Sequence, residues 1–320
     1  MQRRAIGGTG VSVTPIAFGT SALGDMPGTY GYGVDEERAR ATIEAIFDGP
    51  ANCIDASRNY GMGRSEERIG AVIAERGGLP EGFVVSTKLD RDMATGRFDA
   101  DQVRRSIEES LRALGLDRVG ILHFHDPEHA RDLHEITREG GALDAFMRLK
   151  EEGLADALGL AMGRLDIMEP IVRERPLDVV INHNRWTLLN RAADRLFTHC
   201  AERGIAVMNA APYAGGVLAK GADAMPRVTY QEADETALEP VRRIEAACRR
   251  HGVAPGALAL QFSMRDPRVT ATILGVTRPE RVAQTLEWAG ADIPGALWDE
   301  MADLPYSTED PEANRAYQPD

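Results

Sequence analysis

The sequence is poor in cysteine, with only Cys53, Cys200 and Cys248 among its 320 residues. An odd number of widely spaced cysteines fits neither a disulfide framework nor a cysteine-rich metal site. A reducing compartment is therefore expected, and no bound metal. No apolar run follows the first residues, Met1-Gln2-Arg3-Arg4, so no signal peptide is expected either.

Long apolar runs and an excess of positive charge are also missing. No window approaches the roughly 18 consecutive apolar residues that a membrane helix needs. The 37 Lys and Arg residues are outnumbered by 50 Asp and Glu residues, which gives a net charge of −13. Binding to a nucleic-acid backbone requires a clustered positive face instead. With 43% hydrophobic and 27% charged residues, the chain is expected to be a globular cytoplasmic protein that binds neither membranes nor nucleic acids.

The G-x-G-x-x-G spacing of a Rossmann phosphate turn is absent as well. The glycine-rich stretches at residues 7–10, 28–33 and 61–63 all fail this pattern. A dinucleotide, if one binds, must therefore be held by a site of another design.

What the sequence does contain is a regular alternation of strand and helix patterns. Residues 4–13 predict a hairpin around a glycine turn, which would close the bottom of a barrel. Ser65 is expected to cap the helix that it begins. The expected strands are 16–18, 53–55, 83–88, 119–125, 155–160, 179–182, 205–209 and 269–273, and the helices that follow them are 35–47, 65–75, 100–114, 142–150, 165–173, 191–203, 235–251 and 279–289. Eight such units predict an α/β fold, a (β/α)8 TIM barrel with an N-terminal hairpin and a C-terminal helix, forming a single domain over residues 1–320.

Three successive strands each end in an ionisable side chain, namely Asp55, Lys88 and His125. Tyr60 follows in the loop after Asp55. Taken singly, each has an ordinary explanation: a capping acid, a solvated lysine, a pocket-lining phenol, or a turn closed by Pro127. Because barrel enzymes carry their active sites at the carboxyl ends of the strands, the four together favour a catalytic group.

These segments resemble the aldo-keto reductase family, and the resemblance runs from about Arg4 to Leu304. The branch it resembles most contains L-fucose and D-threo-aldose 1-dehydrogenases and pyridoxal 4-dehydrogenase. The similar motifs are Ile54-Asp55-Ala56-Ser57-Arg58-Asn59-Tyr60-Gly61, Ser65-Glu66-Glu67-Arg68-Ile69-Gly70, Ser86-Thr87-Lys88, the segment 106–117 and Leu122-His123-Phe124-His125-Asp126-Pro127. The resemblance implies an NAD(P)-dependent oxidoreductase that transfers a hydride between nicotinamide and a carbonyl or sugar hemiacetal.

The resemblance also implies a role for each catalytic residue. Tyr60 would donate the proton, although a phenol titrates near ~10 and needs help to exchange a proton at neutral pH. Lys88 would stabilise the phenolate, and Asp55 would keep Lys88 charged and in place. His125 would donate a hydrogen bond to the substrate oxygen.

The cofactor, NADP or NAD, is expected to meet several departures from the family pattern. Ala161 and Met162 occupy the positions of a frequent Ser-Asn pair, His183 replaces a glutamine, Ala210 an aromatic residue and Gly275 a lysine. The resemblance assigns cofactor contacts to Gly19, Thr20, Asp55, His183, Ala211, Tyr213, Gly215, Gly275, Val276, Arg278, Arg281 and Gln284.

A small carbonyl compound or sugar is the expected substrate, with Tyr30, Tyr32, Arg58 and Trp186 as its contacts. Aromatic faces with polar donors suit a polyol, although any loop can carry such residues. The alternatives are a broad-specificity aldehyde/ketone reductase, a nucleotide-sensing regulatory subunit, and a metal-dependent hydrolase. His123 and His125 have a spacing found in metal sites, but His123 is expected to be a hydrogen-bonded residue of the core or pocket. The choice between a monomer and a homo-oligomer stays open.

Overall fold

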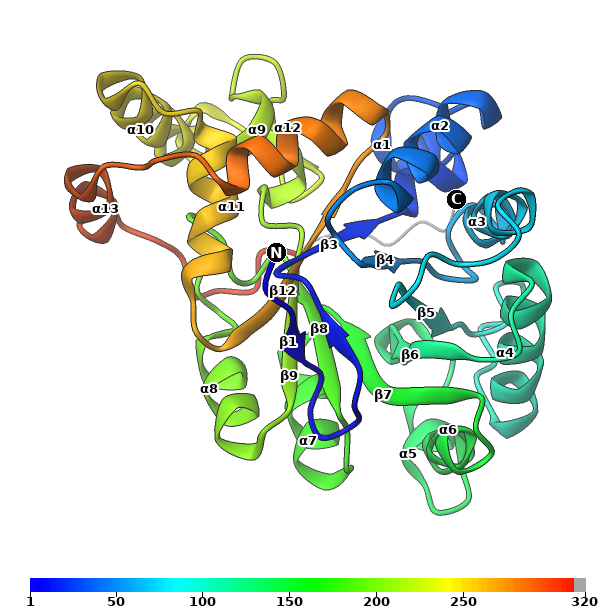
Figure 1. Cartoon of the computed structure of the whole chain (residues 1–320). Helices are drawn as coiled ribbons and strands as arrows, with labels where there is room; N and C mark the ends of the chain where they lie inside the picture. Colours follow the sequence, from blue (N-terminus) through cyan, green and yellow to red (C-terminus); the bar gives the residue numbers. More distant parts are fainter. Residues whose placement is uncertain (314–320) are drawn as a thin grey trace.

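The barrel strands are short and buried on both faces, as parallel strands covered by helices usually are. The computed structural model describes residues 1–313. In it the strands close into a barrel in the order β12-β3-β4-β5-β6-β7-β8-β9, surrounded by helices (Figure 1). The strands are β3 (Ile16–Gly19), β4 (Cys53–Asp55), β5 (Val84–Leu89), β6 (Val119–His125), β7 (Ala155–Met162), β8 (Val179–His183), β9 (Ala206–Ala210) and β12 (Val269–Gly275). The predicted (β/α)8 barrel is confirmed, whereas the predicted single domain includes residues 314–320, which lie outside the described part.

Alternation along each strand divides the side chains between two cores. Ile54 and Leu122 point outward into the apolar layer beneath the helices. Their neighbours in the chain point into the barrel, since successive strand residues face opposite sides. The interior cluster includes Ala17, Cys53, Ile121, Ala157, Val179, Met208 and Ala271.

The helices follow the predicted positions closely, with two differences. Ser65 was expected to cap α3 but lies inside it, because the N-cap residue is Gly63, with a φ of 102°. A further helix, α11, was not predicted: residues 256–260 are all buried and show no polar face. The helices are α2 (Glu36–Phe47), α3 (Arg64–Glu75), α4 (Ala100–Leu114), α6 (Ala142–Glu151), α7 (Leu165–Glu174), α8 (Asp194–Arg203), α10 (Glu235–His251), α11 (Pro255–Arg265), α12 (Pro279–Ala289) and α13 (Gly295–Ala302).

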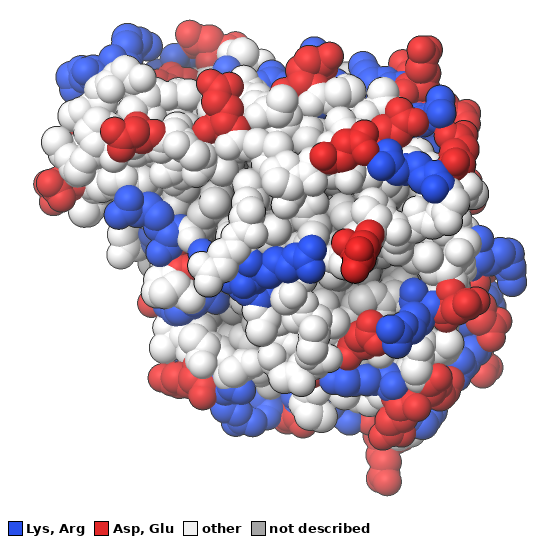
Figure 2. Space-filling model, in the orientation of Figure 1, with Lys and Arg blue, Asp and Glu red and all other residues white. Residues whose placement is uncertain are grey.

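The N-terminal hairpin, β1 (Arg4–Ala5) with β2 (Ser12–Val13), closes the bottom of the barrel as expected. Ile6 and Val13 are buried in the interior cluster. Arg4 Nη1 donates to the carbonyl of Val269, the first residue of β12, at 2.6 Å. The hairpin lies in front of the barrel in Figure 1. On the face seen in the same orientation, positive and negative side chains are interspersed (Figure 2).

Shorter elements lie in the connections between the main ones. They are η1 (Ser21–Gly24), α1 (Pro27–Tyr30), η2 (Pro127–His129), α5 (Leu133–Thr137), η3 (Ala214–Gly216), α9 (Val217–Lys220) and the antiparallel pair β10 (Arg227–Val228) and β11 (Gln231–Glu232). Among the helices of residues 1–313, none has both the length and the apolar character of a membrane span.

Candidate active site

A cavity of about 360 Å³ lies at the carboxyl ends of the barrel strands. Asp55, Tyr60, Lys88 and His125 all line it. Asp55, Lys88 and His125 come from the neighbouring strands β4, β5 and β6, whose parallel pairing places their side chains on one side of the barrel. The structure therefore brings the four expected residues into one site.

Asp55 and Lys88 form a buried ion pair in this cavity. Lys88 Nζ donates to Asp55 Oδ2 at 2.7 Å and to the carbonyl of Ala56 at 2.6 Å. The hydroxyl of Ser86, opposite Asp55 on β5, donates to the other carboxylate oxygen at 2.9 Å. Buried charges need such partners, so this network fixes the position of the ammonium group.

Tyr60 lies next to this ion pair. Lys88 Nζ is 4.5 Å from the centre of the Tyr60 ring, and the rings of Tyr60 and His125 meet edge to face at 5.9 Å. Burial, followed by the charge of Asp55, raises the pKa of Tyr60 well above its ordinary value. The expected stabilisation of the phenolate by Lys88 is thus opposed by burial and by the carboxylate that neutralises the lysine. At neutral pH Tyr60 carries its proton.

His125 is held by a carboxylate that was missed in the sequence, that of Asp90. Its Nδ1 lies 2.6 Å from Asp90 Oδ1, so Nδ1–H donates to the carboxylate. The Ser57 hydroxyl and the Asn59 backbone N–H donate to Asp90 Oδ2 at 2.6 and 2.8 Å. Asp90 follows β5 two residues after Lys88, so both side chains lie on the same side of the strand end. This spacing is a feature of the sequence from which Asp90 could have been predicted as a site residue.

A second carboxylate faces the other nitrogen of the same ring. Asp126 Oδ2 lies 3.5 Å from His125 Nε2, and Asp126 has a left-handed backbone with φ 42°. Burial alone would lower the pKa of His125, but Asp126 and Asp90 outweigh it and raise the pKa. The two carboxylates therefore favour an imidazolium whose Nε2–H faces Asp126, a residue of the cavity wall.

His123 lies deeper in the barrel and is fully buried, as expected. The expected hydrogen bond is not formed, because neither ring nitrogen has a partner within residues 1–313. Burial and the charge of Lys88 lower its pKa well below the usual value, so the ring is neutral. A side chain at Gly159 on β7 would lie 2.4 Å from His123 Nδ1, so the ring packs directly over that glycine. Within residues 1–313, no three His, Cys, Asp or Glu side chains are arranged to hold a metal ion.

Most of the expected cofactor residues line the cavity, but two do not. Thr20 is fully buried, and its hydroxyl donates to the carbonyl of Asp55 at 2.9 Å. Arg278 is the N-cap residue of α12 and is not among the lining side chains. Those that line the cavity are Gly19, Asp55, His183, Ala211, Tyr213, Gly215, Gly275, Val276, Arg281 and Gln284.

One end of the cavity is rich in positive charge, although the chain as a whole is acidic. Lys220 and Arg281 both line it. Burial, and then repulsion by Arg281 and Arg278, lowers the pKa of Lys220. Several positive side chains close together favour binding of an anion. The pyrophosphate of a dinucleotide is such an anion. The adjoining loop has left-handed backbone at Ala214, Gly215 and Gly216, with φ of 49°, 77° and 111°. The N–H groups of Ala214 and Gly216 donate to carbonyls within the same turn. The side chains of Lys220 and Arg281 are therefore the groups that fit the phosphates of a dinucleotide.

The four expected substrate residues divide into two pairs. Tyr30 and Tyr32 line the cavity with their ring centres 6.0 Å apart. Arg58 instead binds Glu66 at 3.1 Å and the carbonyl of Met62 at 3.2 Å, which ties the Tyr60 loop to α3.

Trp186 also lies away from the cavity. It is 8% exposed and packs in the core against Phe197 and Phe262. Arg58 and Trp186 were expected to contact the substrate, and the structure corrects this expectation. An ion pair with Glu66 holds Arg58 away from the cavity, and aromatic packing holds Trp186 in the core.

Comparisons with known proteins identify a family for this barrel. The model of the aldo/keto reductase family matches residues 15–301. The chain is 29% identical to a D-threo-aldose 1-dehydrogenase from Pseudomonas sp, over 93% of this chain and 96% of that protein. It is also 29% identical to a pyridoxal 4-dehydrogenase from Microbacterium luteolum, over 93% and 95%. The holo form of an aldo-keto reductase from Bacillus halodurans superposes with a TM-score of 0.78 at 18% identity, over 99% and 100% of the two chains, which shows the shared fold.

Proposed function

Because the chain belongs to the aldo/keto reductase family, we propose that this oxidoreductase is an NAD(P)-dependent aldose 1-dehydrogenase. It would oxidise the anomeric carbon of an aldopyranose to a lactone. The observation that supports this most is the meeting of Asp55, Tyr60, Lys88 and His125 in one cavity with a cationic end. A bound nicotinamide would accept the hydride, chemistry that no side chain provides.

The side chains would accept the proton that oxidation releases in addition to the hydride. In oxidation, the phenolate form of Tyr60 would take the proton of the anomeric hydroxyl while the C1 hydrogen leaves as hydride to the nicotinamide. Because Tyr60 carries its proton at neutral pH, this direction requires that the phenol first loses that proton to solvent, and it is favoured at high pH. The ammonium of Lys88, held by Asp55, stabilises the charge on the phenol oxygen as the proton moves. His125 donates through Nε2 to the substrate oxygen and orients it. Carbonyl reduction runs through the same positions in reverse.

The cavity wall supports a neutral polyol as the substrate. Tyr30, Tyr32 and Tyr230 all line the cavity and provide aromatic faces for a sugar ring. Asp126 lies in the lining as well, beside the nitrogen of His125 that would meet the reacting oxygen. A carboxylate at this point accepts hydrogen bonds from sugar hydroxyls and repels an anionic substrate. The name of the aldose dehydrogenase relative is in keeping with this substrate class.

Use of both NAD and NADP is proposed, since the cationic end of the cavity offers Lys220 and Arg281 but has Gly275 in place of a frequent lysine. One charge-assisted contact contributes about 1.5–3 kcal/mol, so losing it weakens a preference for the 2′-phosphate without abolishing NADP binding. Titration of NADH and NADPH into the protein measures this directly. Binding of only one of them at any reachable concentration would contradict dual use.

A broad-specificity aldehyde and ketone reductase is the second candidate. The raised pKa of Tyr60 favours it, because a protonated phenol is ready to donate to a carbonyl oxygen. A nucleotide-sensing regulatory role is the third candidate, and the intact arrangement of four reactive side chains argues against it.

A substrate screen in both directions separates these candidates. L-Fucose, D-arabinose and L-galactose are each offered with NAD and NADP, alongside simple alcohols, and small aldehydes with NADH and NADPH. We expect oxidation of at least one aldose and poor use of simple alcohols. Efficient aldehyde reduction without any sugar oxidation would establish the reductase instead, and tight cofactor binding without turnover would favour the regulatory role.

A further inference from the structure

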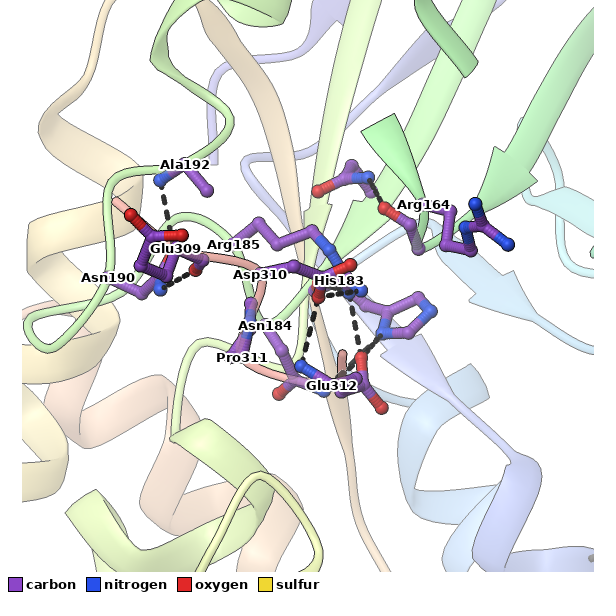
Figure 3. A network of polar contacts seen from close by, with 12 residues as sticks. Arg164, His183, Asn184, Arg185, Asn190, Ala192, Glu309, Asp310, Pro311 and Glu312 are labelled. Atoms are coloured by element: carbon purple, nitrogen blue, oxygen red, sulfur yellow. Dashed lines mark hydrogen bonds and ion pairs between the residues drawn. The ribbon is translucent and has the colours of Figure 1, made fainter. Parts of the chain in front are cut away.

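Arg185 is one of the largest fully buried side chains, and both of its ion-pair partners come from the chain after α13. Its Nη2 donates to Asp310 Oδ1 at 2.6 Å, and its Nη1 donates to Glu312 Oε2 at 2.7 Å. Figure 3 shows the guanidinium between these two carboxylates. A buried guanidinium without such partners would be strongly unfavourable, so the pairing anchors residues 307–312, here named the C-terminal clasp.

Backbone contacts hold the clasp along the rest of its length. Ser307 exchanges hydrogen bonds with the loop after β8: its N–H donates to the carbonyl of Leu189 at 2.9 Å, and its carbonyl accepts from Arg191 at 2.8 Å. The carbonyl of Pro311 accepts from Gln231 Nε2 on β11 at 2.9 Å. The residue before Gln231, Tyr230, lines the cavity. The clasp thus joins the loop after β8 to the segment that brings Tyr230 into the cavity wall.

Glu312 also reaches a residue of the cavity wall. Its Oε2 lies 3.1 Å from Nδ1 of His183, the last residue of β8 (Figure 3). The side chain of Asn184 donates to the same oxygen at 3.4 Å. Burial alone would raise the pKa of Glu312, but His183 and Arg185 lower it far below its usual value. The amide nitrogen of Asn184 also lies 3.3 Å from Nδ1, but Glu312 is nearer and its carboxylate can only accept, so Nδ1–H of His183 donates to Glu312.

The opposite edge of the His183 ring faces Gly163, just after β7. A side chain at Gly163 would lie 3.0 Å from His183 Nε2 and 2.8 Å from Arg185 Nη1. Within the described residues, Nε2 makes no hydrogen bond. The neighbouring cavity residues Ala161 and Met162 have apolar side chains. The ring is held from one side and leaves one nitrogen free to meet a ligand.

We propose that Glu312 is a positioning residue of the cofactor site, which acts by fixing His183 against the carboxamide of the nicotinamide. With Nδ1–H committed to Glu312, Nε2 accepts from the carboxamide NH2 when the ring is neutral. It donates to the carboxamide oxygen when the ring is protonated. The clasp thereby completes a binding site whose other residues come from the barrel strands and their loops. This inference rests on the proposed use of a nicotinamide cofactor.

Paired titrations test this inference with a readout other than activity. The full-length chain and its Glu312→Ala variant are titrated with NADH or NADPH, and with ADP-ribose or its 2′-phosphate, which lack the nicotinamide. Glu312→Ala is expected to weaken binding of the complete dinucleotide by about tenfold and to leave the ADP-ribose probe unchanged. Equal weakening of both probes, or no weakening of either, would overturn the proposal.

Two further variants separate positioning from loss of the ion pair. Asp310 Oδ1 also accepts the backbone N–H of Glu312 at 2.9 Å, so Asp310→Asn is used, which removes a charge from Arg185 and keeps this acceptor. Asp310 makes no contact with His183, so the ratio of the two affinities should stay that of the parent chain. Glu309→Ala changes an exposed clasp residue whose carbonyl, not its side chain, binds Asn190. If the parent chain binds ADP-ribose and the dinucleotide equally, no nicotinamide contact exists and the proposal fails. If it binds neither probe, the proposed function fails.

Glu312→Gln serves if the alanine variant does not fold, because it keeps the side-chain volume and a neutral acceptor. The 15N shifts of His183 then report on the same contact without any ligand. In the parent chain we expect a signal for protonated Nδ1, and in Glu312→Gln a shift toward a mixture of tautomers. Identical His183 spectra together with identical dinucleotide affinity would rule the positioning role out.

Discussion

Asp90 Oδ1 lies 2.6 Å from His125 Nδ1, while the second oxygen of the same carboxylate is held by Ser57 and Asn59. The carboxylate is buried, and its pKa is low: burial would raise it, but the contacts with His125 and Ser57 outweigh burial. A fixed acceptor at Nδ1 determines both the ring orientation and the nitrogen that faces the cavity. Asp90 itself does not line the cavity, so it acts on the substrate through His125.

Asp90→Asn should lower the activity by reducing the charge that keeps His125 protonated. A charge-assisted hydrogen bond contributes about 1.5–3 kcal/mol, so we expect a loss of roughly 10- to 100-fold in kcat/KM. Because Asp90 helps to raise the pKa of His125, the variant should also lose activity at a lower pH than the parent chain. Asp101→Asn, an exposed acid in the first turn of α4, is the matched control. An unchanged pH profile would remove Asp90 from this role.

Tyr60→Phe should abolish hydride transfer and leave cofactor binding nearly unchanged. Loss of a general acid costs roughly 100- to 10,000-fold in rate. The ring itself remains, so its packing against His125 and Lys88 is kept. Turnover and cofactor affinity are measured on the same preparation. A variant that keeps more than about half of the activity would show that another group transfers the proton.

Lys88→Met should remove activity and destabilise the fold, because Asp55 is left as a buried carboxylate without its cation. Removing one partner of a buried pair costs about 3–5 kcal/mol. Adding Asp55→Asn should restore part of that stability without restoring activity. Urea unfolding of both single variants and of the double variant measures the coupling. Strictly additive losses would mean that the two side chains do not interact as the 2.7 Å contact indicates.

Acid should loosen the C-terminal clasp. Folding lowers the pKa of Glu312, so its contribution to stability is complete above the usual value of 4.5 and is lost as the pH falls below it. Glu312→Gln should therefore flatten the dependence of unfolding free energy on pH below about 4.5. Glu309→Gln, whose side chain is exposed, should follow the parent chain. If all three curves fall in parallel from neutral pH to about pH 3, Glu312 is not the titrating group.

The barrel and the centre of its site were accessible from sequence because their signals are local. Asp55, Lys88 and His125 each end a short apolar run, and repetition of this pattern on consecutive strands gives their proximity. Asp90 was missed because an acid after a strand looks like an ordinary turn residue. Its role depends on a contact with the ring of His125, which lies at the end of the neighbouring strand β6.

Contacts between distant segments could not be predicted in the same way. The pairing of Arg185 with Glu312 joins positions 127 residues apart, and no spacing rule relates them. Arg58 and Trp186 show the opposite error, in which a site contact was predicted and the structure does not contain it. Both have side chains suited to a sugar, but ion pairing to Glu66 and aromatic packing in the core direct them elsewhere.

The closing seam of the barrel, where β12 pairs with β3, has a consequence for how the protein folds. Thr272 lies beside Ile16 there, so the two edges of the sheet come from nearly opposite ends of the chain. Contacts so distant in sequence form slowly, because a long loop must close before they contribute. At roughly 5–20 residues per second, a ribosome releases β3 well before it makes β12. Until β12 is in place, the edge of β3 that will pair with it is open and can pair wrongly with another chain. The same edge is exposed during refolding, so the refolding yield should fall as protein concentration rises.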